Sequence, residues 1–166
     1  VLADLGSHLF DTARFLFGEA QSLYCQHHRT RGDIVGVDVA TVMLKFGDVT
    51  CICEMSNATH NQWGAAFPAF IVVEGTQGTL EVGPDYWVRI ATDEGHQARR
   101  YAPPTYPWAD NQSAWHASIV DCNEDLLQAF NTGQPAETSG RDNLKTMRLL
   151  FSAYESAARD QVITFN

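Results

Sequence analysis

The sequence predicts an α+β protein with an open, predominantly antiparallel β-sheet and helices packed on one face. Segments with strand character follow one another from residue 22 to residue 102, joined by short turns typical of hairpins, which favours antiparallel pairing. One helical segment precedes the strands and two longer ones follow them. Strands in series with helices at the ends are typical of α+β proteins.

The first element is a predicted helix over residues 3–17. Its apolar side chains recur at helical spacing, and Gly18 is a natural stop because glycine readily adopts the left-handed conformation that ends many helices. The apolar positions are Leu2, Leu5, Leu9, Ala13, Leu16 and Phe17.

The strands come next and are paired by turn residues. They are predicted at residues 22–30, 37–46, 49–56, 69–74, 79–82, 86–92 and 97–102, with turns at 47–48, 75–78 and 93–95. Residues 57–68 read as a polar and aromatic loop.

A proline-rich connector over residues 103–108 separates the strands from two helices, predicted at 113–131 and 139–159. Ser139 is a suitable N-cap, and residues 162–165 could form a closing strand. The apolar stripe of the first helix is Ile119, Cys122, Leu126, Leu127 and Phe130, and that of the second is Leu144, Met147, Leu150, Phe151 and Tyr154.

Strands 37–46 and 49–56 are largely apolar on both faces. A sheet with one solvated face shows a cleaner alternation, so the face that the helices leave open is expected to meet another domain or subunit. The alternative is that these segments simply have a high β-propensity.

Charge and composition exclude several classes of protein. The 166 residues carry 11 Lys+Arg against 20 Asp+Glu, a net charge of -9, which argues against nucleic-acid binding. No apolar run is long enough to span a membrane, and the N-terminus has neither a secretory pattern nor an initiator Met. The four cysteines are expected to be reduced, which favours the cytoplasm. The length suggests a single domain over 1–166.

The most informative cluster of polar residues is Asp4, His8 and Asp11, spaced i, i+4 and i+7 on one helix face. A carboxylate beside an imidazole orients the ring and holds its tautomer, as a general acid–base requires. The alternative is that Asp4 lies near the helix N-terminus and pairs with His8 on the surface without a catalytic role, which would give the same spacing. The three side chains could instead converge on a metal ion, with partners such as His60 or His116.

Four further residues are candidates for substrate contacts: Asn57, His60, Trp63 and Trp108. Amides and imidazoles bind hydroxyl groups, and indole rings stack on apolar faces. An ordinary surface loop explains the first three equally well. The chain carries neither a G-x-G-x-x-G nor a G-x-x-x-x-G-K-[ST] motif, so no residue of it is expected to bind a nucleotide.

Residues 4–11, DLGSHLFD, resemble the D-x-G-x-H-x-x-D segment that opens the C-terminal domain of the Gfo/Idh/MocA oxidoreductases. Residues 73–82 and 136–144 agree with the same family in order, so the resemblance covers essentially the whole chain. It implies an open sheet of the kind in glyceraldehyde-3-phosphate-dehydrogenase-like C-terminal domains, whose free face commonly forms a homodimer or tetramer contact.

The resemblance also implies a function. Family members oxidise sugars, polyols or related secondary alcohols, or reduce the matching ketones, with NAD or NADP bound by an N-terminal Rossmann domain that these residues lack. His8 matches the family's acid–base histidine and Asp4 the aspartate that positions it. The lysine of the family's E-K-P motif has no counterpart here, because Lys45 and Lys145 stand in other contexts. The alternative is a stand-alone oligomerisation or ligand-binding module without catalysis.

Overall fold

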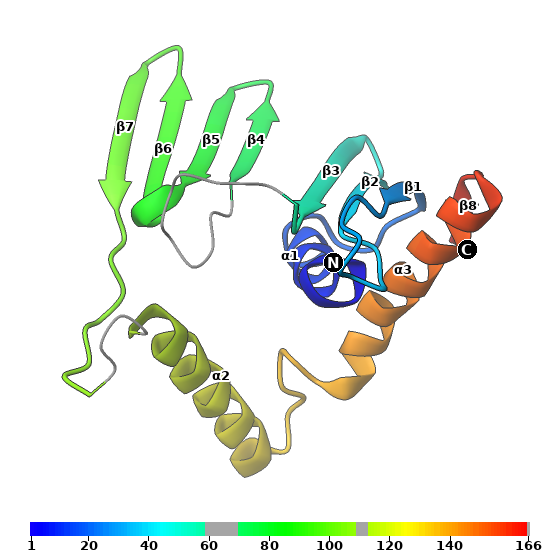
Figure 1. Cartoon of the computed structure of the whole chain (residues 1–166). Coiled ribbons are helices and arrows are strands. Elements are labelled where there is room, and N and C mark those ends of the chain that lie inside the picture. Colours follow the sequence, from blue (N-terminus) through cyan, green and yellow to red (C-terminus); the bar gives the residue numbers. More distant parts are fainter. Residues whose placement is uncertain (59–69, 109–112, 166) are drawn as a thin grey trace. The chain divides into compact units, whose positions relative to one another are not determined.

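A computed structural model of the chain describes residues 1–58, 70–108 and 113–165 (Figure 1). The helical elements are η1 (Leu2–Gly6), α1 (Ser7–Phe17), η2 (Pro84–Tyr86), α2 (Ser113–Thr132) and α3 (Gly140–Arg159). The strands are β1 (Ser22–His28), β2 (Val39–Phe46), β3 (Val49–Ser56), β4 (Ile71–Gly75), β5 (Gly78–Gly83), β6 (Trp87–Thr92), β7 (Gly95–Arg100) and β8 (Ile163–Thr164).

The α+β class and the antiparallel pairing that the sequence predicts are confirmed. The described strands form two four-stranded sheets, ordered β3-β2-β1-β8 and β4-β5-β6-β7, and every described strand pair is antiparallel. The chain divides into two compact units, the first comprising Val1–Thr59 and Ala129–Asn166 and the second His60–Gln128.

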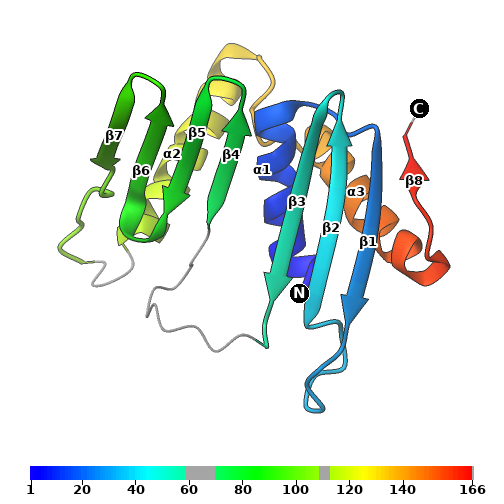
Figure 2. The same cartoon turned by 90° about the horizontal axis from the view of Figure 1, so that it is seen from above.

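In the first unit, α1 and α3 cover one face of the sheet (Figure 2). The strands alternate buried and exposed side chains, as the period of two along a strand requires. The core lies between this face and the helices, and its buried side chains include Leu2, Phe10, Leu23, Val42, Leu44, Phe46, Met55, Leu149 and Leu150. The opposite face leaves Met43 and Ile52 about half exposed, at 49% and 60%.

The predicted apolar stripe of the first helix is partly wrong. Phe10 is completely buried where Leu9 is only half-buried, and Leu16 is exposed. The cause is η1, a π-helical turn in which the Gly6 amide donates to the Val1 carbonyl oxygen at 3.2 Å. A π-turn holds more residues than an α-turn, so the side chains after it are displaced in phase around the axis.

The second unit contains three consecutive hairpin-linked strand pairs from β4 to β7. Gly78 is required at the start of β5, because a Cβ atom there would lie 2.2 Å from the carbonyl oxygen of Ala91. The predicted apolar stripe of α2 is exposed, and Phe130 is 85% accessible. The sequence pattern gives the helical period of this stripe but not a surface that covers it.

Candidate functional site

Asp4 and His8 lie at the beginning of the first helical segment, Asp4 in η1 and His8 in the first turn of α1. The Ser7 hydroxyl donates to the Asp4 carbonyl oxygen at 2.7 Å, and the Thr12 hydroxyl donates to the His8 carbonyl oxygen at 2.8 Å. Both side chains are exposed. The segment therefore presents an imidazole and a carboxylate to solvent from a backbone held by local hydrogen bonds.

This segment is held against β3 by close packing. Leu2 is completely buried, and a Cβ atom added to Gly6 would lie 3.4 Å from the sulfur of Met55. Even a Cβ atom at this position would be in ordinary van der Waals contact with Met55, so η1 lies close against the sheet. The position of Asp4 and His8 follows from this contact.

The side chains of Asp4 and His8 form neither a hydrogen bond nor an ion pair with each other, although both are among the described residues. The pairing predicted from their spacing therefore stays a prediction for the substrate-bound protein. Catalytic hydrogen bonds are often loose before substrate binds, so this geometry does not remove either residue from the proposed site.

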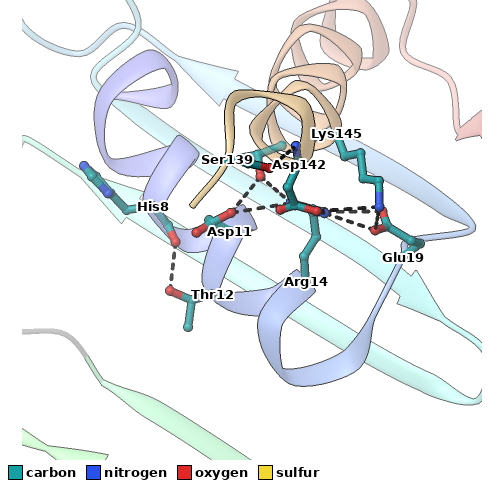
Figure 3. A network of polar contacts seen from close by, with 9 residues as sticks. His8, Asp11, Thr12, Arg14, Glu19, Ser139, Asp142 and Lys145 are labelled. Atoms are coloured by element: carbon teal, nitrogen blue, oxygen red, sulfur yellow. Dashed lines mark hydrogen bonds and ion pairs between the residues drawn. The ribbon is translucent and has the colours of Figure 1, made fainter. Parts of the chain in front are cut away.

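Asp11 does not share the environment of His8, contrary to the predicted common face. Its carboxylate accepts a hydrogen bond from the Thr146 hydroxyl at 2.9 Å and lies 3.5 Å from a guanidinium nitrogen of Arg14. Figure 3 shows the His8 ring pointing away from this cluster. Among residues 1–58, 70–108 and 113–165, no group of three or more His, Cys, Asp or Glu side chains is placed to hold a metal ion. The metal hypothesis for Asp4, His8 and Asp11 thus finds no support in this geometry.

The cluster that contains Asp11 is centred on Arg14, a residue that no sequence motif singles out. The Arg14 side chain is 6% exposed and donates to both carboxylate oxygens of Asp142, at 2.9 and 3.1 Å. It also donates to Glu19 at 3.0 and 3.3 Å and to the Thr146 hydroxyl at 2.7 Å. These bonds join α1 to the start of α3, and they saturate a guanidinium that would otherwise be costly to bury.

The arginine stabilises the charged forms of its partners. Hydrogen bonds from Arg14 lower the pKa of Glu19 and of Asp142, and these two carboxylates raise the pKa of Arg14. Asp142 has a second role through its backbone, because its amide donates to the Ser139 hydroxyl at 3.2 Å and so confirms the predicted N-cap.

We expect acid to weaken the fold through these two carboxylates. Their pKa values are lower in the folded state than in the unfolded state, so their contribution is complete above the unfolded values, near 4. It is lost as pH falls through the folded values. The measurement is the free energy of unfolding in urea at pH 6, 4 and 3, and D142N should show a smaller decrease than the wild type. An equal decrease in both proteins would contradict this assignment.

A surface hollow of about 670 Å³ lies beside the Arg14 cluster. Thr12 and Phe15 of α1 line it together with Gly140 and Asn143 at the start of α3. Its charged lining includes Arg14, Glu19 and Asp142, which are already engaged with one another. The hollow is thus part of the junction between the two helices.

The remaining predicted substrate residues are placed differently. Asn57 follows β3 with an exposed side chain, and its amide donates to the Asp38 carbonyl oxygen at 2.7 Å. The neighbouring Val37 accepts a hydrogen bond from the amino group of Val1 at 2.6 Å, so Asn57 lies at the end of the sheet where η1 begins. His60 and Trp63 lie outside the described residues.

Trp108 belongs to an aromatic cluster in the second unit. Its ring stacks on Tyr106 with centroids 5.0 Å apart and forms a T-shaped contact with His116, with centroids 4.7 Å apart. Trp108 is 64% exposed, so part of the indole ring is accessible to solvent. Such a surface suits the apolar face of a sugar ring, beside groups that can bind hydroxyls.

Residues 1–81 match the family described as the GFO/IDH/MocA C-terminal domain. The first half of the chain is thus similar to the GFO/IDH/MocA C-terminal domain. Two curated relatives extend the likeness to nearly all of the chain. It is 36% identical over 166 residues to a D-apiose dehydrogenase of Paraburkholderia graminis, and 32% identical over 167 residues to one of Rhizobium rhizogenes.

Each of these matches covers 98% of the chain but only 44% and 48% of the relative. The chain thus spans about half the length of the curated relatives it matches. Among solved structures, an oxidoreductase from Agrobacterium radiobacter in complex with NAD+, L-tartaric acid and magnesium matches with a TM-score of 0.90 and 32% identity. That match covers 99% of this chain and 48% of the other.

Asp4 and His8 lie on one helical segment with exposed side chains, and their roles stay a prediction. The sequence indicates the burial of Arg14 only weakly, because a charged residue among the apolar positions of a helix can be exposed or can be buried with charged partners. Its partner Asp142 is 128 residues away, so no local pattern indicated the pairing.

Proposed function

We propose that these 166 residues are the C-terminal, substrate-binding part of an NAD(P)-dependent oxidoreductase that acts on a secondary alcohol of a sugar, or on the matching ketone. The observation that supports it most is the 36% identity to a D-apiose dehydrogenase over 98% of the chain. D-Apiose is the first substrate to test. NAD or NADP is expected to bind to a Rossmann domain outside the 166 residues, because this chain lacks a dinucleotide motif.

His8 is the proposed general base. Its exposed imidazole accepts the hydroxyl proton of the substrate, and the bound nicotinamide supplies the acceptor for the hydride. Asp4 is expected to orient the imidazole and to stabilise its protonated form once substrate closes the site. In the reverse direction the same imidazole returns the proton to the carbonyl oxygen.

The activity test uses the full-length protein that contains this chain. With D-apiose and NAD+ or NADP+, the absorbance of the reduced nucleotide at about 340 nm should rise, and it should not rise without the sugar. The isolated 166 residues should show no turnover. Absence of both turnover and sugar binding across a panel of sugars and polyols would favour the non-catalytic module.

Trp108 is the proposed stacking residue for the sugar. We expect W108A to raise KM about fivefold with little change in kcat, because loss of one aromatic contact costs about 1 kcal/mol. Trp115, on the following helix and 51% exposed, provides the matched control. If W115A raises KM as much as W108A, the effect is not specific to the cluster with Tyr106 and His116. Asn57, His60 and Trp63 are weaker candidates for further substrate contacts.

We further propose that the chain acts as one domain and forms a homodimer or tetramer through the open face of the first sheet. The exposed Met43 and Ile52 on that face support this contact, beside polar positions such as Thr41. Light scattering of the full-length protein measures the oligomer number.

A cytoplasmic location agrees with the four cysteines, none of which is in a disulfide. Among the described residues, no helix is long and apolar enough to cross a membrane.

A further inference from the structure

The loop between β1 and β2 is anchored by a buried carboxylate. Asp38 is completely buried, and its side chain accepts hydrogen bonds from the backbone amides of Thr30 and Arg31 at 2.8 and 2.7 Å. The Thr30 hydroxyl donates to the same carboxylate at 2.9 Å. These donors offset the cost of burying the charge, so they give the loop a defined conformation.

This loop lies at the end of the first sheet where the proposed site begins (Figure 2). The Val37 carbonyl oxygen accepts a hydrogen bond from the amino group of Val1, which directly precedes η1. The Asp38 carbonyl oxygen accepts one from the amide of Asn57, which follows β3. The loop therefore contacts the segment that carries Asp4 and also the start of the segment that carries the candidate substrate contacts.

Within the loop, Arg31 is held by Asp33 through one edge of its guanidinium. The Nε atom and one terminal nitrogen donate to the two carboxylate oxygens, at 3.1 and 2.6 Å. The other terminal nitrogen lies 3.5 Å from the carbonyl oxygen of Asn57. A guanidinium has five N–H donors, and the Arg31 side chain is 46% exposed. With respect to residues 1–58, 70–108 and 113–165, its outer edge thus keeps N–H groups for a ligand.

The ion pair of Arg31 with Asp33 is not what holds the loop. Both side chains are exposed to a large extent, and water screens such pairs so that they contribute little to stability. Asp38 anchors the backbone instead. The main effect of Asp33 is to orient the guanidinium and to balance its charge. An oriented arginine whose charge is balanced fits an uncharged hydroxyl group better than a carboxylate or a phosphate.

We propose that Arg31 binds a hydroxyl oxygen of the substrate and that Asp33 is its positioning residue. This inference rests on the proposed function and adds a specificity-determining contact to it. The outer edge of the guanidinium donates to the oxygen, at the end of the sheet that also presents Asn57 and the η1 segment. The contact is remote from the hydride transfer, so it is equally strong in the ground state and in the transition state. Its loss therefore raises KM and leaves kcat unchanged.

The test compares variants of the full-length protein with D-apiose and NAD+ or NADP+. R31A should raise KM for the sugar about tenfold or more, with kcat within about threefold of wild type, because a charged donor is lost. R31K keeps the charge but not the planar fork, so its KM should lie between the two. R29A is the matched control, since Arg29 is an exposed arginine of the same loop, and its KM should equal that of wild type.

A double-mutant cycle tests the role of Asp33. D33A should raise KM less than R31A does, and adding D33A to R31A should change KM no further, because Asp33 acts through the guanidinium. All these variants should unfold at the wild-type urea concentration, as expected for an exposed pair. A purely structural role would instead lower that concentration and reduce kcat as well.

The outcomes separate this inference from the proposed function. Turnover by wild type with an unchanged KM in R31A would overturn the role of Arg31 and leave the proposed function intact. An equal rise of KM in R29A would also overturn it, because the charge of the loop would then explain the effect. Absence of turnover by wild type across the sugars and polyols would overturn both.

Discussion

Replacing His8 by alanine in the full-length protein is expected to lower kcat by about 100-fold or more. The proposed reaction removes a hydroxyl proton as hydride leaves, and a positioned general base contributes about 10²–10⁴-fold. His8 is exposed at the start of α1, so its loss removes an acid–base group without opening the core. The measurement is the initial rate of nicotinamide reduction at saturating sugar.

The control for this variant is His28, an exposed histidine at the end of β1. H28A should keep the wild-type kcat, and H8A should unfold at the same urea concentration as wild type. Turnover of H8A within a few-fold of wild type would remove His8 from the mechanism. If kcat of H8A depends on pH in the same way as kcat of the wild type, the conclusion is the same.

Replacing Arg14 by alanine is expected to lower the free energy of unfolding by about 2–3 kcal/mol. Removal of one partner of a buried ion pair costs about 3–5 kcal/mol, but here the carboxylates of Glu19 and Asp142 are 57% and 40% exposed and can be hydrated. The loss also leaves the Thr146 hydroxyl, in a residue that is 1% exposed, without its arginine donor. Urea unfolding of wild type and R14A measures the difference.

Two further variants separate this network from ordinary surface charge. Arg159 pairs with Glu155 at 2.8 Å four residues earlier in α3, with its side chain 64% exposed, and R159A should cost no more than about 0.5 kcal/mol. R14K keeps the charge but cannot bind Asp142 through two parallel bonds, so its stability should lie between R14A and wild type. A loss below 1 kcal/mol in R14A would show that the junction of α1 and α3 does not depend on this side chain.

Local sequence patterns predicted most of the fold. Turn chemistry placed the hairpins correctly, as at Gly47, where φ is +57° between β2 and β3. The start of α3 followed from Ser139, whose hydroxyl caps it. The burial of α2 did not follow, because a helical stripe such as that ending at Phe130 indicates periodicity but not what covers it.

The candidate site was predictable only where its residues are close in sequence. The spacing of Asp4 and His8 indicated a shared helical segment, and both side chains are exposed on it. Arg14 depends on partners at the start of a distant helix. Contacts that form only in the folded chain decide its environment.

The π-turn of η1 gives the segment that carries the proposed acid–base pair an adjustable register. Loss of a single codon within Leu2–Gly6 would let this turn relax into an ordinary α-helix. The π-turn holds one residue more than an α-turn, so the helix can absorb this deletion without rotating the residues that precede it. A deletion of Leu5 would place Asp4 three residues before His8 instead of four, while α1 stayed joined to α3 by Arg14. The geometry of the proposed acid–base pair can therefore change by a small deletion while Leu2 keeps its place in the core.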